Sequence, residues 1–181
     1  DVCSSDLVGF QVYDGTNLSN TVSNQVTVTP VNDTTIVSTT NGTTPFTEGN
    51  NVTSTPVAVD TGVTVTDADT STLASATVSI TSNYQSGQDV LAFVNTNSTT
   101  FGNIAASYNS STGVLTLTSA SATATVAQWQ AALQSVTYTN SSEAPNTSTR
   151  TISFVGNDST SNSKTATKDV SVTSTNDAPL I

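Results

Sequence analysis

A long internal repeat constrains this chain more than any other feature of its sequence. Residues 10–33 (FQVYDGTNLSNTVSNQVTVTPVND) align without a gap with residues 154–177 (FVGNDSTSNSKTATKDVSVTSTND) at an offset of 144 residues, and ten of the 24 aligned positions are identical. The identical pairs are Phe10/Phe154, Asp14/Asp158, Thr16/Thr160, Ser19/Ser163, Thr21/Thr165, Val26/Val170, Val28/Val172, Thr29/Thr173, Asn32/Asn176 and Asp33/Asp177. Similarity at a fixed spacing is the signature of a tandem repeat array.

The repeat also predicts how the chain divides. We expect a complete repeat over residues 34–177, preceded by the C-terminal hairpin and linker of an upstream repeat over residues 8–33. Residues 178–181 are then the start of the next repeat. Residues 8–29 are expected to be a lone hairpin without a sheet of its own, and such hairpins are marginally stable in water.

The first seven residues, DVCSSDL, resemble the translated end of a common sequencing adapter. We interpret residues 1–7 as a non-native scar and exclude them from the fold prediction. The chain's single cysteine, Cys3, lies in this segment. Disulfide bonds are therefore not expected to stabilise the natural protein in this region.

Alternation of apolar and polar residues with period two runs through most of the complete repeat and predicts an all-β fold. The strand-like runs are residues 34–39, 56–67, 73–81, 89–94, 113–118, 135–140, 149–155 and 165–173, with turn signals at Asn41-Gly42, Ser86-Gly87 and Thr112-Gly113. Eight strands with regular turns predict two packed antiparallel sheets, in an immunoglobulin-like or cadherin-like β-sandwich.

One segment, residues 125–136, breaks the strand pattern. Its apolar residues Val126, Trp129, Leu133 and Val136 recur at helical spacing. Thr123 or Thr125 precedes them as a suitable N-cap. We predict one short helix that closes the sandwich, with Trp129 as a core anchor rather than a platform for a ligand.

The charge of the chain excludes several classes of partner. The formal net charge is −10, with three basic residues and no histidine. Nucleic acids and anionic membranes bind positive surfaces, so neither is an expected partner, whereas cations are. The sequence has no apolar run long enough to span a bilayer, so membrane insertion is not expected.

Acidic residues carry the chemistry that this sequence suggests. Asp67 and Asp69 lie two apart in TVTDADTSTL, which places both side chains on one face of an extended segment. Carboxylate, carbonyl and amide oxygens are the ligands that Ca²⁺ prefers, whereas zinc and copper usually take histidine or cysteine. The alternative interpretation is that Asp67 and Asp69 form only a solvated turn.

Further acidic residues recur at positions that resemble a known family. They are Asp14 ahead of the upstream hairpin's final strand, Asp33 in the linker VND and Glu48 in FTEGN. Together with the DAD motif, the closing NDAP and the segment TVAQWQAALQSVTYTNSSE, their order resembles the cadherin-like tandem repeats of large bacterial surface adhesins. The resemblance extends more distantly to cadherins and chondroitin sulfate proteoglycan repeats, and it covers residues 8–181.

The resemblance implies calcium at the junctions between consecutive domains. At the upstream junction the implied ligands are Asp14, Asn32, Asp33, Glu48, Asp67 and Asp69. At the downstream junction they are Glu143, Asp158, Asn176 and Asp177. The linker VND is less acidic than cadherin linkers usually are, so fewer or weaker calcium ions are expected.

The resemblance also implies a function: a non-catalytic spacer or adhesion repeat of a long secreted cell-surface protein, made rigid by calcium and packed against neighbouring repeats. An alternative is a module that binds a glycan or host surface through loops such as residues 96–103. A Thr-rich surface for ice, suggested by VTVT, LTLT and TATV, is a further alternative. Catalysis is not expected because no histidine, nucleophile motif or phosphate loop is present, although Asp67 and Glu143 could in principle form a glycosidase pair.

Overall fold

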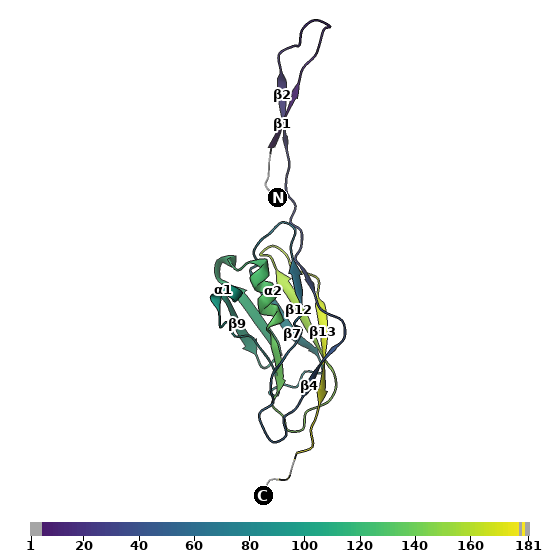
Figure 1. The fold of residues 1–181 in the computed structure, drawn as a ribbon, viewed down its shortest axis with the longest axis vertical. Helices are drawn as coiled ribbons and strands as arrows, with labels where there is room; N and C mark the ends of the chain where they lie inside the picture. Colours follow the sequence, from purple (N-terminus) through teal and green to yellow (C-terminus); the bar gives the residue numbers. More distant parts are fainter. Residues whose placement is uncertain (1–4, 178, 180–181) are drawn as a thin grey trace. The chain divides into compact units, whose positions relative to one another are not determined.

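The computed structural model describes residues 5–177 and residue 179 (Figure 1). It divides into two units, Asp1–Asp33 and Thr34–Ile181. Residues 1–4 of the suspected scar, with Cys3, lie outside the described residues. So do residues 178, 180 and 181 at the predicted start of the next repeat.

The first unit is a two-stranded antiparallel hairpin. Strand β1 (Ser5–Phe10) pairs with β2 (Val22–Thr27), and Phe10 lies opposite Val22. From residue 6 onward every residue of this unit is exposed except the half-buried Ser19. The hairpin therefore has no hydrophobic core among its described residues.

The second unit is built from three hydrogen-bonded sheets. A six-stranded sheet has the order β4 (Thr43–Thr47), β13 (Ala166–Thr173), β12 (Arg150–Asn157), β7 (Ser75–Ser82), β10 (Val114–Ser119) and β9 (Ile104–Asn109). A three-stranded sheet has the order β5 (Val57–Ala58), β11 (Thr137–Asn140) and β8 (Asp89–Ala92). The remaining pair is β3 (Ile36–Ser38) with β6 (Thr64–Thr66).

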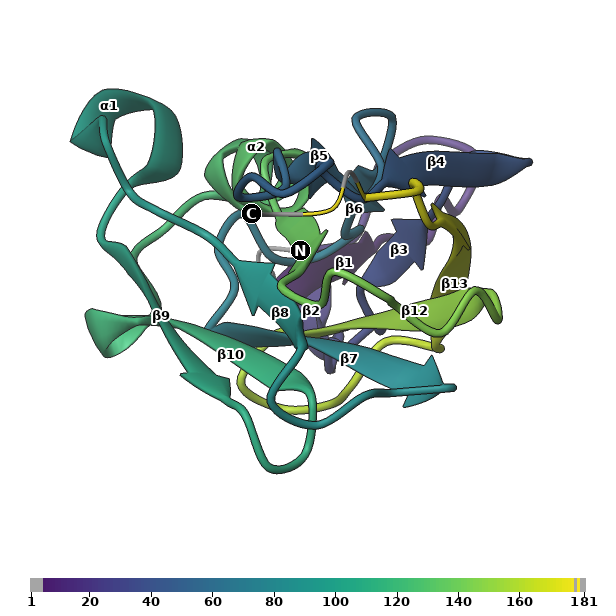
Figure 2. The ribbon, with the colours of Figure 1, turned by 90° about the horizontal axis from the view of Figure 1, so that it is seen from below.

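These sheets form two layers around one core, which confirms the prediction of an all-β, sandwich-like fold. Figure 2 shows helix α2 (Val126–Gln134), β5 and β8 across the core from β7, β10 and β12. The buried side chains of the six-stranded sheet include Val78, Leu115, Leu117, Ile152 and Phe154. Phe46 of β4 packs edge to face against Tyr138 of β11, with 5.2 Å between the ring centres, so aromatic packing joins the layers. The immunoglobulin-like or cadherin-like type of the sandwich stays a prediction.

Helix α2 begins where the sequence predicts. Thr125 is its N-cap and forms a capping box with Gln128, because each side chain bonds the other residue's backbone N–H. Trp129 is fully buried, and its indole N–H donates to the Leu73 carbonyl at 3.0 Å. The prediction of Trp129 as a core anchor is therefore confirmed.

Two strands and a short helix were not predicted. Strands β4 and β9 are the two edges of the six-stranded sheet, and helix α1 (Ser98–Phe101) precedes β9. Strand β4 contains Pro45, which an edge strand tolerates because an edge position does not require every backbone N–H. Residues 56–67, predicted as one strand, divide into β5 and β6, which belong to different sheets.

No helix in the described part of the chain has the length and apolar character needed to traverse a bilayer.

A buried ion pair lies between the layers. Arg150, fully buried on β12, donates from Nε to Asp89 Oδ2 at 3.1 Å. The other oxygen of Asp89 accepts from the hydroxyl of Tyr138 and the amide of Asn140, both at 2.6 Å. Burial, followed by the bond and charge of Asp89, raises the pKa of Tyr138, so this hydroxyl stays protonated as a donor. The network joins β8, β11 and β12.

Replacing Arg150 should strongly destabilise the second unit. Arg150→Ala leaves the buried carboxylate of Asp89 without its counter-charge, a change that typically costs about 3–5 kcal/mol. Urea unfolding of the whole chain, followed by Trp129 fluorescence, measures the change in free energy of unfolding.

Lys164→Ala is the matched control, because it removes the same charge from an exposed side chain. Its effect should stay within about 0.5 kcal/mol. Equal stability of Arg150→Ala and Lys164→Ala would show that the ion pair is not a structural element.

Candidate cation site at the end of the second unit

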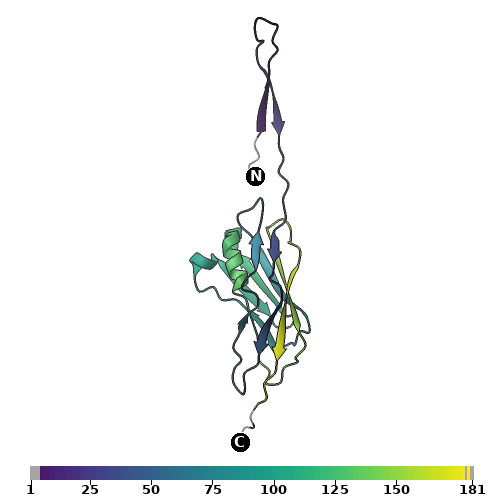
Figure 3. The same cartoon turned by 45° about the vertical axis from the view of Figure 1, so that its right-hand side comes forward.

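The parallel pairing of β4 with β13 brings two distant segments together. Thr43 pairs with Asp169 and Thr47 with Thr173, so the C-terminal ends of both strands lie at the same end of the sheet. Figure 3 shows the two arrows side by side, pointing the same way toward the C-terminal end of the unit. Glu48, which follows β4, therefore meets the segment that follows β13.

Five hydrogen bonds attach the C-terminal segment to the loop after β4. Three of them involve Glu48: its N–H donates to the Thr173 carbonyl at 3.0 Å, its Oε2 accepts from the Thr175 N–H at 2.5 Å, and its carbonyl accepts from the Thr175 hydroxyl at 2.8 Å. The other two come from the amide of Asn50, which donates to the Asn176 carbonyl, and the N–H of Asn51, which donates to Asp177 Oδ1, both at 3.0 Å. Asp177 is thereby fixed near Glu48.

The loop after β4 is tight, which explains the residue types at positions 49 and 51. A Cβ at position 49 would lie 2.6 Å from the Val52 carbonyl oxygen, so only glycine fits there without a shift. Asn51 has φ +51°, a left-handed conformation that asparagine adopts more readily than most residues. This geometry directs the Asn51 N–H to Asp177.

A third carboxylate comes from the segment after β11. Exposed Glu143 contributes one oxygen to a group with buried Glu48 and half-buried Asp177, and one carboxylate oxygen from each residue lies within 4.8 Å of the others. Two like charges at about 4 Å repel by about 1 kcal/mol in water and about 4 kcal/mol at a dielectric constant of about 20. The three groups thus raise the free energy of the folded protein unless a cation lies among them.

The burial of Glu48 is the second indication of a cation. Its side chain is 3% exposed, and among the described residues no hydrogen-bond donor reaches its Oε1. A buried ionised oxygen without a donor is costly, and coordination to a metal ion satisfies it. A site whose side-chain ligands are all carboxylates suits Ca²⁺, which takes six to eight oxygen ligands.

The structure groups the predicted ligands differently from the sequence. Glu48, expected with Asp67 and Asp69, lies instead with Glu143 and Asp177. Asp158, expected with Asp177, lies at the opposite end of the unit, because it follows β12 and the antiparallel strand β13 runs back from there. Of the implied downstream ligands, Glu143, Asn176 and Asp177 are at the C-terminal end.

Asp67 and Asp69 belong to a turn rather than to a strand. Asp67 Oδ1 accepts from the N–H groups of Asp69 at 3.2 Å and Thr70 at 3.0 Å, and its Oδ2 accepts from the Thr35 hydroxyl at 2.8 Å. Burial acts to raise the pKa of Asp67, but these hydrogen bonds outweigh it and lower the pKa. The carboxylate of Asp67 therefore already has a structural role.

The remaining predicted ligands are in the first unit. Asp14 Oδ1 accepts from the N–H groups of Thr16 and Asn17, both at 2.8 Å, and the Asn17 bond followed by the Thr16 bond lowers the pKa of Asp14. Asn32 and Asp33 follow β2, whereas Asp14 follows β1, so the antiparallel pairing places them at opposite ends of the hairpin. The structure does not bring these three residues together.

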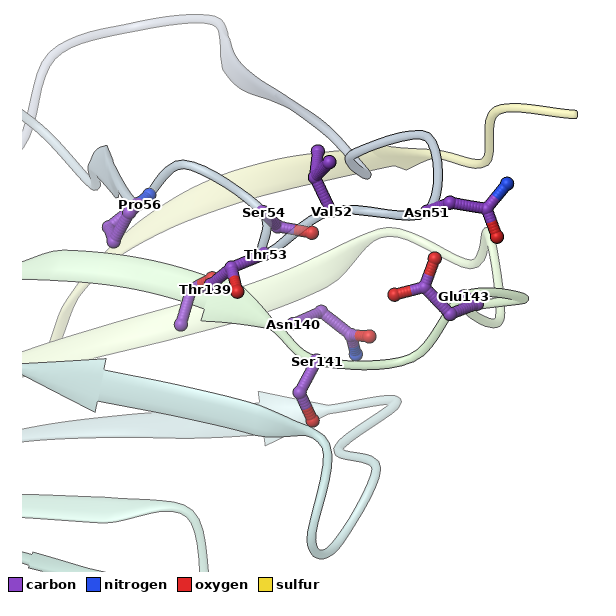
Figure 4. Close-up of a pocket in the computed structure, with 9 residues that line it drawn as sticks. All are labelled: Asn51, Val52, Thr53, Ser54, Pro56, Thr139, Asn140, Ser141 and Glu143. Carbon is purple, nitrogen blue, oxygen red and sulfur yellow. The ribbon is translucent and has the colours of Figure 1, made fainter. Parts of the chain in front are cut away.

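A polar pocket adjoins the carboxylate group. It has a volume of about 470 Å³ and shares Glu143 with the group (Figure 4). Its other lining residues are Asn51, Val52, Thr53, Ser54, Pro56, Thr139, Asn140 and Ser141. Figure 4 shows the carboxylate of Glu143 pointing toward the loop that carries Asn51 and Val52. Sequence reasoning did not find this pocket, because its residues come from two distant segments.

Comparison of this chain with protein-family models, with curated proteins and with solved structures finds no match.

Removing one carboxylate should stabilise the cation-free protein. Glu143→Gln keeps the side-chain size and lowers the repulsion on Glu48 and Asp177, so in EDTA at pH 7 the free energy of unfolding should rise by about 1 kcal/mol. Urea unfolding measures it. Asp169→Asn removes a charge on the sheet surface that accepts from the Thr151 hydroxyl, and it should not stabilise the protein. A destabilised Glu143→Gln protein in EDTA would contradict the repulsion described above.

Proposed function

We propose that the second unit is a non-catalytic structural repeat of a longer extracellular adhesin-like protein, in which bound Ca²⁺ fixes the segment that leads to the next domain. The observation that carries the proposal is the group of Glu48, Glu143 and Asp177 at the end where the chain leaves the unit. The resemblance to cadherin-like adhesin repeats supports the same interpretation.

Calcium would act by linking three segments of one unit. Glu48 follows β4, Glu143 follows β11 and Asp177 follows β13. An ion held by their oxygens therefore joins the exit segment, residues 174–177, to both layers. Without an ion, the exit segment is attached by its hydrogen bonds against the repulsion of three carboxylates. With the ion, the repulsion becomes attraction and the direction of the exit segment is fixed.

The number of ligands favours weak binding that suits an extracellular setting. Three carboxylates are fewer than the ligands of a high-affinity site, and extracellular calcium modules bind with Kd of about 10⁻⁴–10⁻³ M. Such a site fills where calcium is millimolar. Such weak binding fits a location at the cell surface.

The described residues do not bring the conceivable catalytic pair together. Asp67 and Glu143, the conceivable glycosidase pair, lie at opposite ends of the unit: Asp67 bonds Thr35, which precedes β3, and Glu143 lies beside Glu48. The Thr-rich runs of the second unit that were suggested for ice lie on β6, on β10 and at the start of α2, so within this unit they do not form one flat array.

Calcium should raise the melting temperature of the whole chain. At 10 mM, which is about 10 to 100 times the expected Kd, a ligand that binds only the folded state adds about 1.4–2.7 kcal/mol, which for a unit of this size corresponds to about 3–10 °C. Differential scanning calorimetry in EDTA and in 10 mM Ca²⁺ measures the shift. Glu48→Gln and Glu143→Gln should each remove most of it.

Two controls define the site. Asp169→Asn, which changes a carboxylate elsewhere on the same sheet, should keep the full response, and Mg²⁺ should produce a smaller shift because it requires a more regular octahedron. The proposal fails if the wild-type chain melts at the same temperature in EDTA and calcium. It also fails if Glu48→Gln responds like wild type.

The polar pocket supports a second candidate function, carbohydrate binding. Six of its nine lining residues carry hydroxyl or amide groups, which can bond the hydroxyls of a sugar. The previously suggested loop, residues 96–103, contains α1, whose four residues offer no buried polar group.

A glycan array probed with the whole chain tests this second function. Thr53→Ala with Ser141→Ala should abolish binding, whereas Thr64→Ala with Thr66→Ala on β6 should not. Absence of binding to any glycan, with and without calcium, leaves the structural repeat as the function.

A further inference from the structure

The hairpin of the first unit has the same strand register as β12 and β13 of the second. Phe10 pairs with Val22, as Phe154 pairs with Ala166, and Val8 pairs with Asn24, as Ile152 pairs with Lys168. Every pair from Asp6–Val26 to Phe10–Val22 has its counterpart 144 residues later. The sequence repeat is thus also a structural repeat.

The turns of the two hairpins carry the same hydrogen bonds. Asp14 accepts from the N–H groups two and three residues later at 2.8 Å, and Asp158 does so at 2.7 Å. The N–H of Ser19 donates to the Val12 carbonyl at 2.8 Å, and that of Ser163 to the Gly156 carbonyl at 2.8 Å. In both turns the same serine's hydroxyl also accepts from the N–H seven residues earlier. Identical residues at these positions therefore have identical structural roles.

The two hairpins differ in what covers them. Phe154, Val170 and Val172 are 0%, 0% and 4% exposed, because β7 pairs with β12, β4 pairs with β13, and the opposite layer packs over them. Their equivalents Phe10, Val26 and Val28 are 60%, 48% and 51% exposed. The apolar face and both outer edges of β1 and β2 have no such cover in the described residues of their unit.

We propose that this apolar face binds one occupant, a polypeptide equivalent to residues 34–149 of the same chain. A strand like β7 would pair with β1, a strand like β4 would run parallel beside β2, and a layer like α2 with β8 and β11 would cover Phe10 and Val26. The hairpin then supplies the last two strands of a repeat. The proposal rests on the tandem organisation in the proposed function but not on calcium, so the two can fail separately.

The strand register continues before Val8, but the chemical similarity of the side chains stops there. Asp6 occupies the position of Arg150, and Leu7 that of Thr151. Arg150 neutralises the buried Asp89. An occupant like residues 34–149 would therefore place its own Asp89 beside the carboxylate of Asp6, so residues 1–7 do not fit it. A test must replace them with the segment that ends at Thr151.

A chimera that joins residues 34–151 directly to residues 8–181 preserves the register, since Val8 takes the place of Ile152. Hydrogen exchange measured by mass spectrometry in EDTA compares amides of residues 22–28 in the chimera and in the original chain. We expect exchange at least about 100-fold slower in the chimera, because these amides become part of a packed sheet. Phe10→Asp with Val26→Asp in the chimera should abolish this protection and leave residues 150–173 protected.

A duplicated repeat, residues 34–177 followed by 34–181, is the folding control. If it folds and the chimera leaves residues 22–28 as exposed to exchange as the original chain does, the proposal is wrong. Protection in the original chain that grows with protein concentration would also overturn it, because a second copy would then be the occupant.

Discussion

The parallel pairing of β4 with β13 is the constraint on which the candidate site depends. Because of it, β4 and the last strand, β13, end at the same place, although they lie more than a hundred residues apart in the sequence. Glu48 and Asp177 meet only because of this pairing, and Glu143 reaches them from the other layer. The exit segment, the two layers and three negative charges therefore converge at one end of the unit.

The acidic side chains at the two ends of the second unit have different hydrogen-bond partners. Asp158 is held by donors within its own turn, and Asp67 by donors of its turn together with the Thr35 hydroxyl, so the pKa of Asp67 is lowered in spite of burial. At the C-terminal end, Glu48 has one oxygen bonded and one without a donor among the described residues. The C-terminal end also brings together three carboxylates from separate segments, Glu48, Glu143 and Asp177, which the DAD turn does not. This difference is why the proposal places calcium at the exit segment rather than at the DAD motif.

Local patterns predicted much of the fold. Period-two alternation located most strands, and the Thr125 cap with the helical spacing around Trp129 located α2. Strand β4 was missed because Pro45 argues against a strand unless the edge position is known. The predicted grouping of the ligands was wrong because pairing between strands that are distant in the sequence has no local signal. The separation of Asp158 from Asp177 was predictable. Asp158 lies in the turn between two antiparallel strands and Asp177 follows the second strand, so the two residues are at opposite ends of the sheet.

The most direct test of calcium at the exit segment is a titration of the ¹⁵N-labelled chain with Ca²⁺, followed by amide chemical shifts. The N–H groups of Thr175 and Asn51 donate to Glu48 and Asp177, so their signals report on the site itself. The account predicts that these two amides shift most and saturate together in the millimolar range or below. Shifts centred on Asp69 and Thr70, or no shifts at all, would contradict it.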